Sequence, residues 1–175
     1  MPVSVPTPDQ VIELADEMGL GKTILALGLM MCNGETRKRN LIVLPPALVD
    51  QWCDAIKQFC PELASVLHVW HGSKGTNTDA FLHVNSAENI VVVTTYGMIA
   101  NRNIANYCSD LWIMDWDRII YDEAHHLRNH KTNTFAGAKQ LHSYQAPDTS
   151  YWFMTGTPIN NKIRDVINLF HLAGI

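Results

Sequence analysis

The chain has 175 residues, of which 47% are hydrophobic and 17% are charged, and its net charge is −4. A chain of this length can bury one substantial core, so we expect a single domain. No stretch approaches the roughly 18 apolar residues of a membrane helix, and the first residues are unlike a signal peptide, so we expect a protein that is neither membrane-embedded nor secreted.

Short apolar runs alternate with helical patterns along the chain. Strands are predicted at 11–15, 40–44, 66–70, 90–94, 118–121 and 151–155, and helices at 22–32, 47–59, 96–109, 132–142 and 163–172. Several strands are continuously apolar, as expected when helices cover both faces of a sheet. This pattern predicts an α/β fold with a doubly wound, mainly parallel sheet. Ligands of such sheets bind at the carboxyl ends of the strands, where Lys22, Asp122 and Thr155 fall.

A candidate phosphate-binding loop joins the first strand to the first helix. Its glycines allow backbone N–H groups to approach phosphate oxygens, Lys22 supplies a positive charge, and Thr23 can bind Mg²⁺ at the positive end of the helix. Asp16 stands where the G-x-x-x-x-G-K-[ST] pattern has its first glycine, so an ordinary glycine-containing turn is the alternative. We predict an ATP site with Mg²⁺, formed by Met18, Gly19, Leu20, Gly21, Lys22 and Thr23.

An acidic pair follows the apolar strand at 118–121. In a phosphate-loop ATPase, Asp122 would hold Mg²⁺ through water, and Glu123 would orient or deprotonate the attacking water. A solvated helix start is the alternative, because acidic residues favour helix N-termini. In combination with the loop, the pair predicts Lys22, Asp122 and Glu123 as catalytic residues, with Thr23 and Asp122 as the Mg²⁺ site.

Five segments resemble motifs of the Swi/Snf-type ATPases of helicase superfamily 2. In family order, LADEMGLGKT (14–23) is similar to motif I, LIVLPPALVDQW (41–52) to motif Ia, VVVTTYGMI (91–99) to motif Ib, IIYDEAHHLRN (119–129) to motif II and FMTGTPINN (153–161) to motif III. The resemblance implies the first RecA-like lobe of a double-stranded DNA translocase, used in chromatin remodelling or DNA repair. The residues after the DEAH sequence are closer to the repair-associated subgroup that carries a ring finger.

The resemblance also implies roles for residues outside the ATP site. It implies that His125, Thr155, Gly156 and Thr157 couple hydrolysis to movement between lobes, and that DNA phosphates are contacted by Pro45, Pro46, Thr94, Thr95 and Tyr96. Such contacts position a protein on DNA without reading sequence. The structural alternatives are that the prolines end a strand, that the threonines cap a helix and that the Thr155 segment is a strand-ending turn.

The resemblance sets limits on what this chain can do alone. Residues 1–175 are expected to form the N-terminal helicase ATP-binding lobe, shortened at its amino end, while the second lobe with its arginines is absent from the sequence. Because an arginine finger is worth roughly 10³ to 10⁵ in hydrolysis rate, we expect nucleotide binding with very slow turnover. A nucleotide-dependent binding module without turnover, or an inactive fragment, is the alternative function. We expect a nuclear location in a eukaryote, and otherwise a cytoplasmic or viral protein.

Three smaller predictions concern cysteine, histidine and tryptophan. The cysteines lack C-x-x-C spacing, which predicts free thiols. His126 and His130 could share a helix face, but no third ligand is placed by the sequence, so a zinc site is disfavoured. The five tryptophans are scattered rather than interleaved with basic residues, which predicts core and surface packing rather than base stacking.

Overall fold

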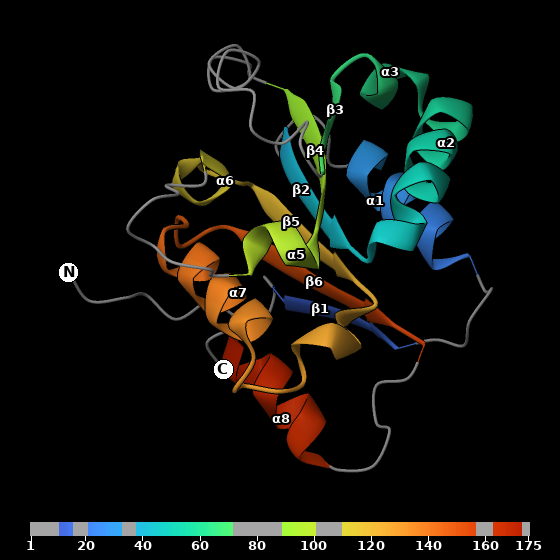
Figure 1. Ribbon diagram of the computed structural model, residues 1–175. Coiled ribbons are helices and arrows are strands. Elements are labelled where there is room, and N and C mark those ends of the chain that lie inside the picture. The colour runs from blue at the N-terminus through green and yellow to red at the C-terminus, as the bar shows by residue number, and fades with distance from the viewer. Residues whose placement is uncertain are drawn as a thin grey trace.

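A parallel sheet runs through the centre of the molecule (Figure 1). The computed structural model describes residues 11–15, 21–32, 38–71, 89–100, 110–156 and 163–172. Within them, six strands pair in the order β1-β6-β5-β2-β4-β3, and each neighbouring pair is parallel. The strands are β1 (Val11–Ala15), β2 (Arg39–Leu44), β3 (Leu67–Trp70), β4 (Ile90–Thr95), β5 (Arg118–Asp122) and β6 (Ser150–Thr155).

Helices cover both faces of this sheet. One group lies on the right of Figure 1 and comprises α1 (Lys22–Cys32), α2 (Val49–Phe59) and α3 (Pro61–Ala64). The other group comprises α5 (Tyr96–Ile99), α6 (Asp110–Ile113), α7 (Asn133–Ser143) and α8 (Ile163–Leu172). Two 3₁₀ turns, η2 (Pro46–Leu48) and η4 (Ala124–Leu127), follow β2 and β5. The predicted doubly wound α/β fold is confirmed.

Each face of the sheet has its own hydrophobic core. Along β2, Ile42 and Leu44 pack with buried residues of α1 and α2, whereas Leu41 and Val43 pack with those of α5 and α7. The alternation follows from the two-residue period of a strand, which sends successive side chains to opposite faces. It explains why Leu41–Leu44 of β2 are apolar at successive positions, because both faces of the strand are buried.

The carboxyl ends of the strands meet at one edge. Ala15 of β1 is level with Thr155 of β6, Asp122 of β5 with Met154, and Leu44 of β2 with Thr95 of β4. The ends of these strands therefore come together at one edge, although β1 and β6 lie more than a hundred residues apart in the chain.

The structure departs from the predicted elements mainly after β4. The predicted helix at 96–109 is wrong in its length, because α5 ends at Ile99 and Ala100 is extended, with φ −61° and ψ 120°. Gly97 weakens this short helix, since glycine in a helix costs about 1 kcal/mol relative to alanine. The helix predicted at 47–59 begins as the 3₁₀ turn η2, and α3, α6 and η4 were not predicted.

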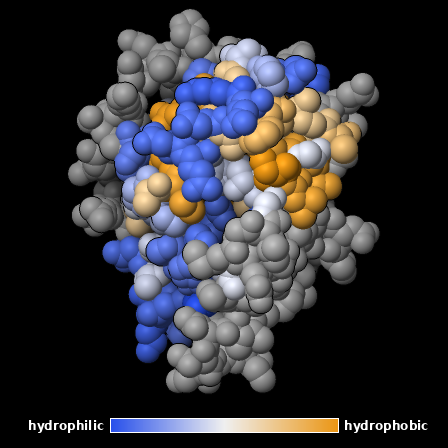
Figure 2. Space-filling view, turned by 90° about the vertical axis from the view of Figure 1, so that its right-hand side faces the viewer, coloured by the Kyte–Doolittle hydropathy of each residue, from blue (hydrophilic) through white to orange (hydrophobic). Residues whose placement is uncertain are grey.

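The exposed side chains of α1 and α2 differ in polarity, and both helices lie on one side of the molecule. The exposed side chains of α2 are nearly all polar, whereas those of α1 are apolar. Figure 2 views this side of the molecule and shows a hydrophilic band next to a hydrophobic patch. The exposed apolar side chains of α1 include Ile24, Leu25 and Met31, so this helix is apolar on its outer as well as its inner face.

Candidate functional site

A cavity of about 590 Å³ opens between the start of α1, the exposed face of α2 and the end of β5. This volume lies within the range of small-molecule sites, which is roughly 300–1,000 Å³. Its lining includes five predicted site residues and seven further residues, namely Gly21, Lys22, Thr23, Asp122 and Glu123 with Ile24, Leu48, Gln51, Asp54, Ala55, Gln58 and Phe59. The structure thus brings together residues of both predicted motifs.

The start of α1 contributes the basic and hydroxyl groups of the cavity. Gly21 has a φ of +80°, a conformation that glycine adopts without the steric cost of a side chain. The carbonyl of Gly21 accepts the N–H of Leu25, so the helix begins directly at the cavity wall. The predicted residues Met18, Gly19 and Leu20 lie outside the described residues. The first N–H groups of a helix lack intrahelical partners, which makes this end suited to an anion.

Asp122 ends β5 and is almost fully buried. Its Oδ1 accepts the backbone N–H of Glu123 at 2.9 Å, and its Oδ2 accepts the indole N–H of Trp52 at 2.7 Å. Burial raises the pKa of this carboxyl, while the two hydrogen bonds and the charge of Lys22 act in the opposite direction. A carboxylate that is withdrawn from water in this way gains from a cation in the cavity.

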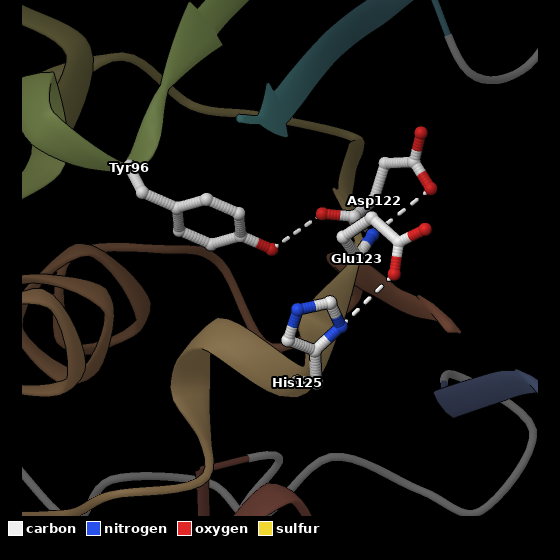
Figure 3. Close-up of polar contacts among 4 residues, drawn as sticks. All are labelled: Tyr96, Asp122, Glu123 and His125. Atoms are coloured by element: carbon white, nitrogen blue, oxygen red, sulfur yellow. Dashed lines mark hydrogen bonds and ion pairs between the residues drawn. The ribbon is translucent and has the colours of Figure 1, made fainter. Parts of the chain in front are cut away.

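Glu123 has a left-handed backbone, with φ 52° and ψ 49°. Among the described non-glycine residues it is the one with a positive φ. Such a conformation costs about 1–2 kcal/mol in a residue with a side chain, and it persists only where the surroundings impose it. The turn sends the glutamate side chain back into the cavity, where Oε2 lies 2.9 Å from Nδ1 of His125 (Figure 3).

Tyr96 holds the peptide group between Asp122 and Glu123 at its carbonyl oxygen. Its hydroxyl donates a hydrogen bond to the backbone oxygen of Asp122 at 2.7 Å (Figure 3). The phenol is fully buried, and its pKa is raised well above the usual value, first by that burial and then by nearby Tyr121. At neutral pH Tyr96 is therefore a neutral donor, held in place by the core.

The residues predicted to contact DNA lie in two environments. Pro45 follows the last residue of β2 in an extended conformation, and Pro46 is exposed at the start of η2. Thr94 and Thr95 are buried, and the hydroxyl of Thr94 donates to the carbonyl of Trp70 at 2.8 Å. Thr95 stands at the N-cap of α5 without making a side-chain cap. The DNA contacts stay a prediction. Because the Thr94 hydroxyl is already bonded to Trp70, contacts at this segment would have to come from backbone groups.

The predicted coupling residues also divide into two groups. Thr155 is buried at the end of β6 and Gly156 follows it, while Thr157 lies outside the described residues. His125 lies in η4, beside Glu123, and its ring stacks on that of His126 at a centroid distance of 4.6 Å. His126 and His130 do not share a helix, because η4 ends at Leu127.

Two sets of site residues were missed in the sequence. The first set, on α2, forms the polar wall of the cavity and comprises Gln51, Asp54 and Gln58. Their spacing of three to four residues places them on one helix face and could have been recognised. The second is Trp52, which was predicted to be core. It is core, and it also donates to Asp122, a contact that no sequence signal indicates because 70 residues separate the two.

The sheet, its helices and the cavity at the strand ends define a RecA-like α/β lobe. The search of protein families gives the SNF2-related domain, matched over residues 12–175. The chain belongs to this family. The recognition of a Swi/Snf-type ATPase lobe from its motifs is therefore confirmed.

Individual relatives agree with this membership. The DNA excision repair protein ERCC-6-like of Danio rerio is 32% identical over 162 residues, which are 91% of this chain and 11% of that protein. The DNA repair protein RAD5B of Arabidopsis thaliana is 28% identical over 204 aligned residues, covering 95% of this chain and 15% of that protein. The chain thus spans between a tenth and a sixth of the length of these two relatives.

A solved structure shows the same fold. The SWI2/SNF2 ATPase core of Sulfolobus solfataricus, in complex with double-stranded DNA, superposes with a TM-score of 0.73 at 25% identity. The match covers 92% of this chain and 31% of that one. Among the described residues, no helix is long and apolar enough to span a membrane.

Proposed function

We propose that this chain is the ATP-binding lobe of a DNA-dependent, Swi/Snf-type motor. The observation that carries the proposal is the cavity in which Lys22 and Thr23, at the start of α1, face Asp122 and Glu123, at the end of β5. Membership of the SNF2-related family supports the same function. Residues 1–175 then correspond to the first RecA-like lobe, and the complete motor requires a second lobe.

The groups in the cavity fit a nucleotide with Mg²⁺. Gly21 leaves its helix start open, since a Cβ added there would meet nothing within 4 Å. The charge of Lys22 already favours the ionised form of Asp122 across the cavity. Asp122 combines deep burial with a raised pKa, which a bound divalent cation would offset. Oxygen groups such as the Thr23 hydroxyl and the Asp122 carboxylate are the ligands that Mg²⁺ prefers.

Each residue then has a defined task. When bound, the nucleotide would supply the phosphoryl group that is transferred, and Mg²⁺ would supply positive charge that offsets the negative charge of the phosphates. Lys22 binds phosphate oxygens, Thr23 and Asp122 hold the metal, and Glu123 orients a water molecule through its carboxylate. His125, whose Nδ1 lies 2.9 Å from Glu123 Oε2, keeps that side chain turned into the cavity.

The proposed partner is the phosphate backbone of duplex DNA, together with the second lobe. The likeness to an ATPase core bound to double-stranded DNA supports this partner. The net charge of −4 indicates that the lobe alone binds DNA weakly, because affinity for DNA depends on phosphate neutralisation by basic residues. Relatives named as DNA repair proteins of an animal and a plant support a nuclear role.

Calorimetry of ATP and ADP with Mg²⁺ tests the proposed site. We expect binding by the intact chain and a loss of about 10- to 100-fold in Lys22→Ala, since a hydrogen bond to a charged group contributes about 1.5–3 kcal/mol. Asp122→Ala should lose the part of the affinity that depends on Mg²⁺. Lys139→Ala is the matched control, because it removes an equal charge from the exposed surface of α7, at a residue outside the cavity lining. An equal loss in Lys139→Ala and Lys22→Ala would contradict the assignment.

Turnover separates a motor lobe from a binding module. The isolated chain should hydrolyse ATP very slowly, because a missing arginine finger costs roughly 10³ to 10⁵ in rate. When a complementary second lobe is joined to the chain, duplex DNA should stimulate hydrolysis strongly. A joined protein that binds ATP and DNA but shows no stimulation would favour the binding module instead.

A further inference from the structure

Asp122 is held from both faces of the sheet by one aromatic side chain on each. Trp52 belongs to the core cluster under α1 and α2, and its indole N–H reaches the carboxylate. Tyr96 belongs to the opposite cluster, and its hydroxyl reaches the backbone oxygen of the same residue. Both donor–acceptor distances are 2.7 Å, which is at the short end for an indole N–H and usual for a hydroxyl.

These two contacts leave Asp122 little freedom. The Trp52 N–H fixes the orientation of the carboxylate, and the Glu123 N–H holds its other oxygen. The Tyr96 hydroxyl fixes the peptide that leads into the left-handed turn at Glu123. Trp52 and Tyr96 are themselves immobilised by packing, being 0% and 5% exposed. A carboxylate whose orientation is set in advance binds a metal ion better than one that must be ordered on binding.

We propose that Trp52 and Tyr96 are positioning residues that orient the Asp122 carboxylate for Mg²⁺ and so set the metal-dependent part of nucleotide affinity. This inference rests on the proposed function, because it assumes that Asp122 holds the metal. Neither side chain is among the residues that line the cavity, so neither would contact a nucleotide bound there. They act through Asp122 alone.

The chain offers matched controls for both side chains. Trp116 is 1% exposed, and its indole N–H donates to the backbone carbonyl of Leu111 at 2.7 Å, the same distance as for Trp52 but outside the cavity lining. Tyr121 precedes Asp122 in β5, yet its hydroxyl lies 2.8 Å from Nε2 of His142 rather than near the acid. Trp116→Phe and Tyr121→Phe therefore remove one indole and one phenol hydrogen bond without releasing Asp122.

The measurement is the affinity of the purified chain for ADP with Mg²⁺ and, separately, with EDTA. We expect Trp52→Phe and Tyr96→Phe to reduce the ratio of the two affinities by about tenfold, the usual effect of losing an outer-shell partner of a metal ligand. The affinity in EDTA should be unchanged. Trp116→Phe and Tyr121→Phe should keep the ratio of the intact chain. An unchanged ratio in the Trp52 and Tyr96 variants, or an equal fall in all four, would overturn the inference.

A spectroscopic measurement on the intact chain covers the case in which a variant does not fold. The indole ¹H–¹⁵N resonances of the tryptophans can be assigned by single substitutions to phenylalanine, or by labelling where a substitution is not tolerated. We expect the Trp52 resonance to move when Mg²⁺ is added to the ADP complex, while that of Trp116 stays in place. A Trp52 resonance insensitive to Mg²⁺ would contradict the inference. An intact chain whose ADP affinity does not depend on Mg²⁺ would instead refute the proposed function.

Discussion

The stability of this fold should depend on pH through His142, in the last turn of α7. Its Nε2 lies 2.8 Å from the Tyr121 hydroxyl, and its Nδ1 lies 2.9 Å from the carbonyl oxygen of Leu172 in α8. A carbonyl can only accept, so Nδ1 carries the proton and Nε2 accepts from Tyr121. The ring also packs on Tyr151 at a centroid distance of 4.0 Å. A neutral imidazole satisfies both partners and ties α7 to β5 and α8.

Protonation of His142 is therefore unfavourable in the folded chain. Burial lowers its pKa from 6.5 to about 4, against a smaller opposing effect of the hydrogen bond to Leu172. Below pH 6.5 the unfolded chain takes up a proton that the folded chain does not bind. The stabilising effect of the neutral ring is complete above that pH and is lost progressively as the pH falls towards about 4.

The pKa values of His142 in the unfolded and folded chain, 6.5 and about 4, give the size of its effect on stability. Between pH 7 and pH 5 the free energy of unfolding should fall by at most about 2 kcal/mol from this histidine alone, at up to about 1.4 kcal/mol per pH unit. The side chain retains some solvent exposure, which makes this figure an upper bound.

Urea unfolding at several pH values measures this effect, with His142→Gln as the comparison. Glutamine does not titrate, so His126 and Asp122, whose pKa values are also shifted, contribute to both proteins and cancel in the difference. The substituted chain should be less stable at pH 7, and the gap should narrow by up to about 2 kcal/mol at pH 5. Parallel stability curves for the two proteins would refute the reasoning.

Three further predictions concern backbone conformation and one cap. Gly21→Ala should destabilise the fold by about 1–2 kcal/mol, because Gly21 has a positive φ. Gly28 lies on α1 with open space around it, so Gly28→Ala should stabilise the fold by up to about 1 kcal/mol. Chemical unfolding measures both variants, and equal effects on the free energy of unfolding would contradict this pair of predictions. Thr132→Ala removes the N-cap that accepts the Phe135 N–H and should cost about 1 kcal/mol in the same assay, while Thr132→Ser should cost much less. Glu123→Gly should raise the free energy of unfolding by about 1 kcal/mol, because glycine adopts the left-handed conformation without strain, and it should abolish hydrolysis in a two-lobe protein. A loss of stability would show that the glutamate side chain stabilises the fold by more than its left-handed backbone destabilises it.

The strands could be predicted closely because both faces of the sheet are buried. Runs such as Ile90–Thr95, which are apolar or β-branched throughout, have few other structures open to them. α1 and α8 begin and end where they were predicted. The helix expected at 96–109 was wrong because α5 ends at Ile99, where Asn101 and Asn103 follow as helix-stop signals that were not weighed; residues 101–109 lie outside the described residues.

The residues that line the cavity could be predicted in part, but their geometry could not. Lys22 and Asp122 stand out in the sequence because the predicted phosphate and metal chemistry requires a lysine at a helix start and an acid at a strand end. The left-handed backbone of Glu123 has no such signal, since glutamate is not among the residues that favour this conformation. The hydrogen bond from Trp52 depends on how α2 packs over the sheet, which the sequence around Trp52 does not specify.

Asp122 and Glu123 show how a strained site is supported by the core. The turn between them places two carboxylates in one cavity, where their charges repel and the peptide conformation is unfavourable. Beside the charge of Lys22, the support comes from neutral donors, because the Trp52 indole and the Tyr96 hydroxyl carry no charge that would compete with a cation. A lysine or arginine in either position would pair with Asp122 and weaken its attraction for Mg²⁺. Neutral aromatic donors anchored in the two hydrophobic cores hold the acid in place while leaving its charge available to the proposed metal ion.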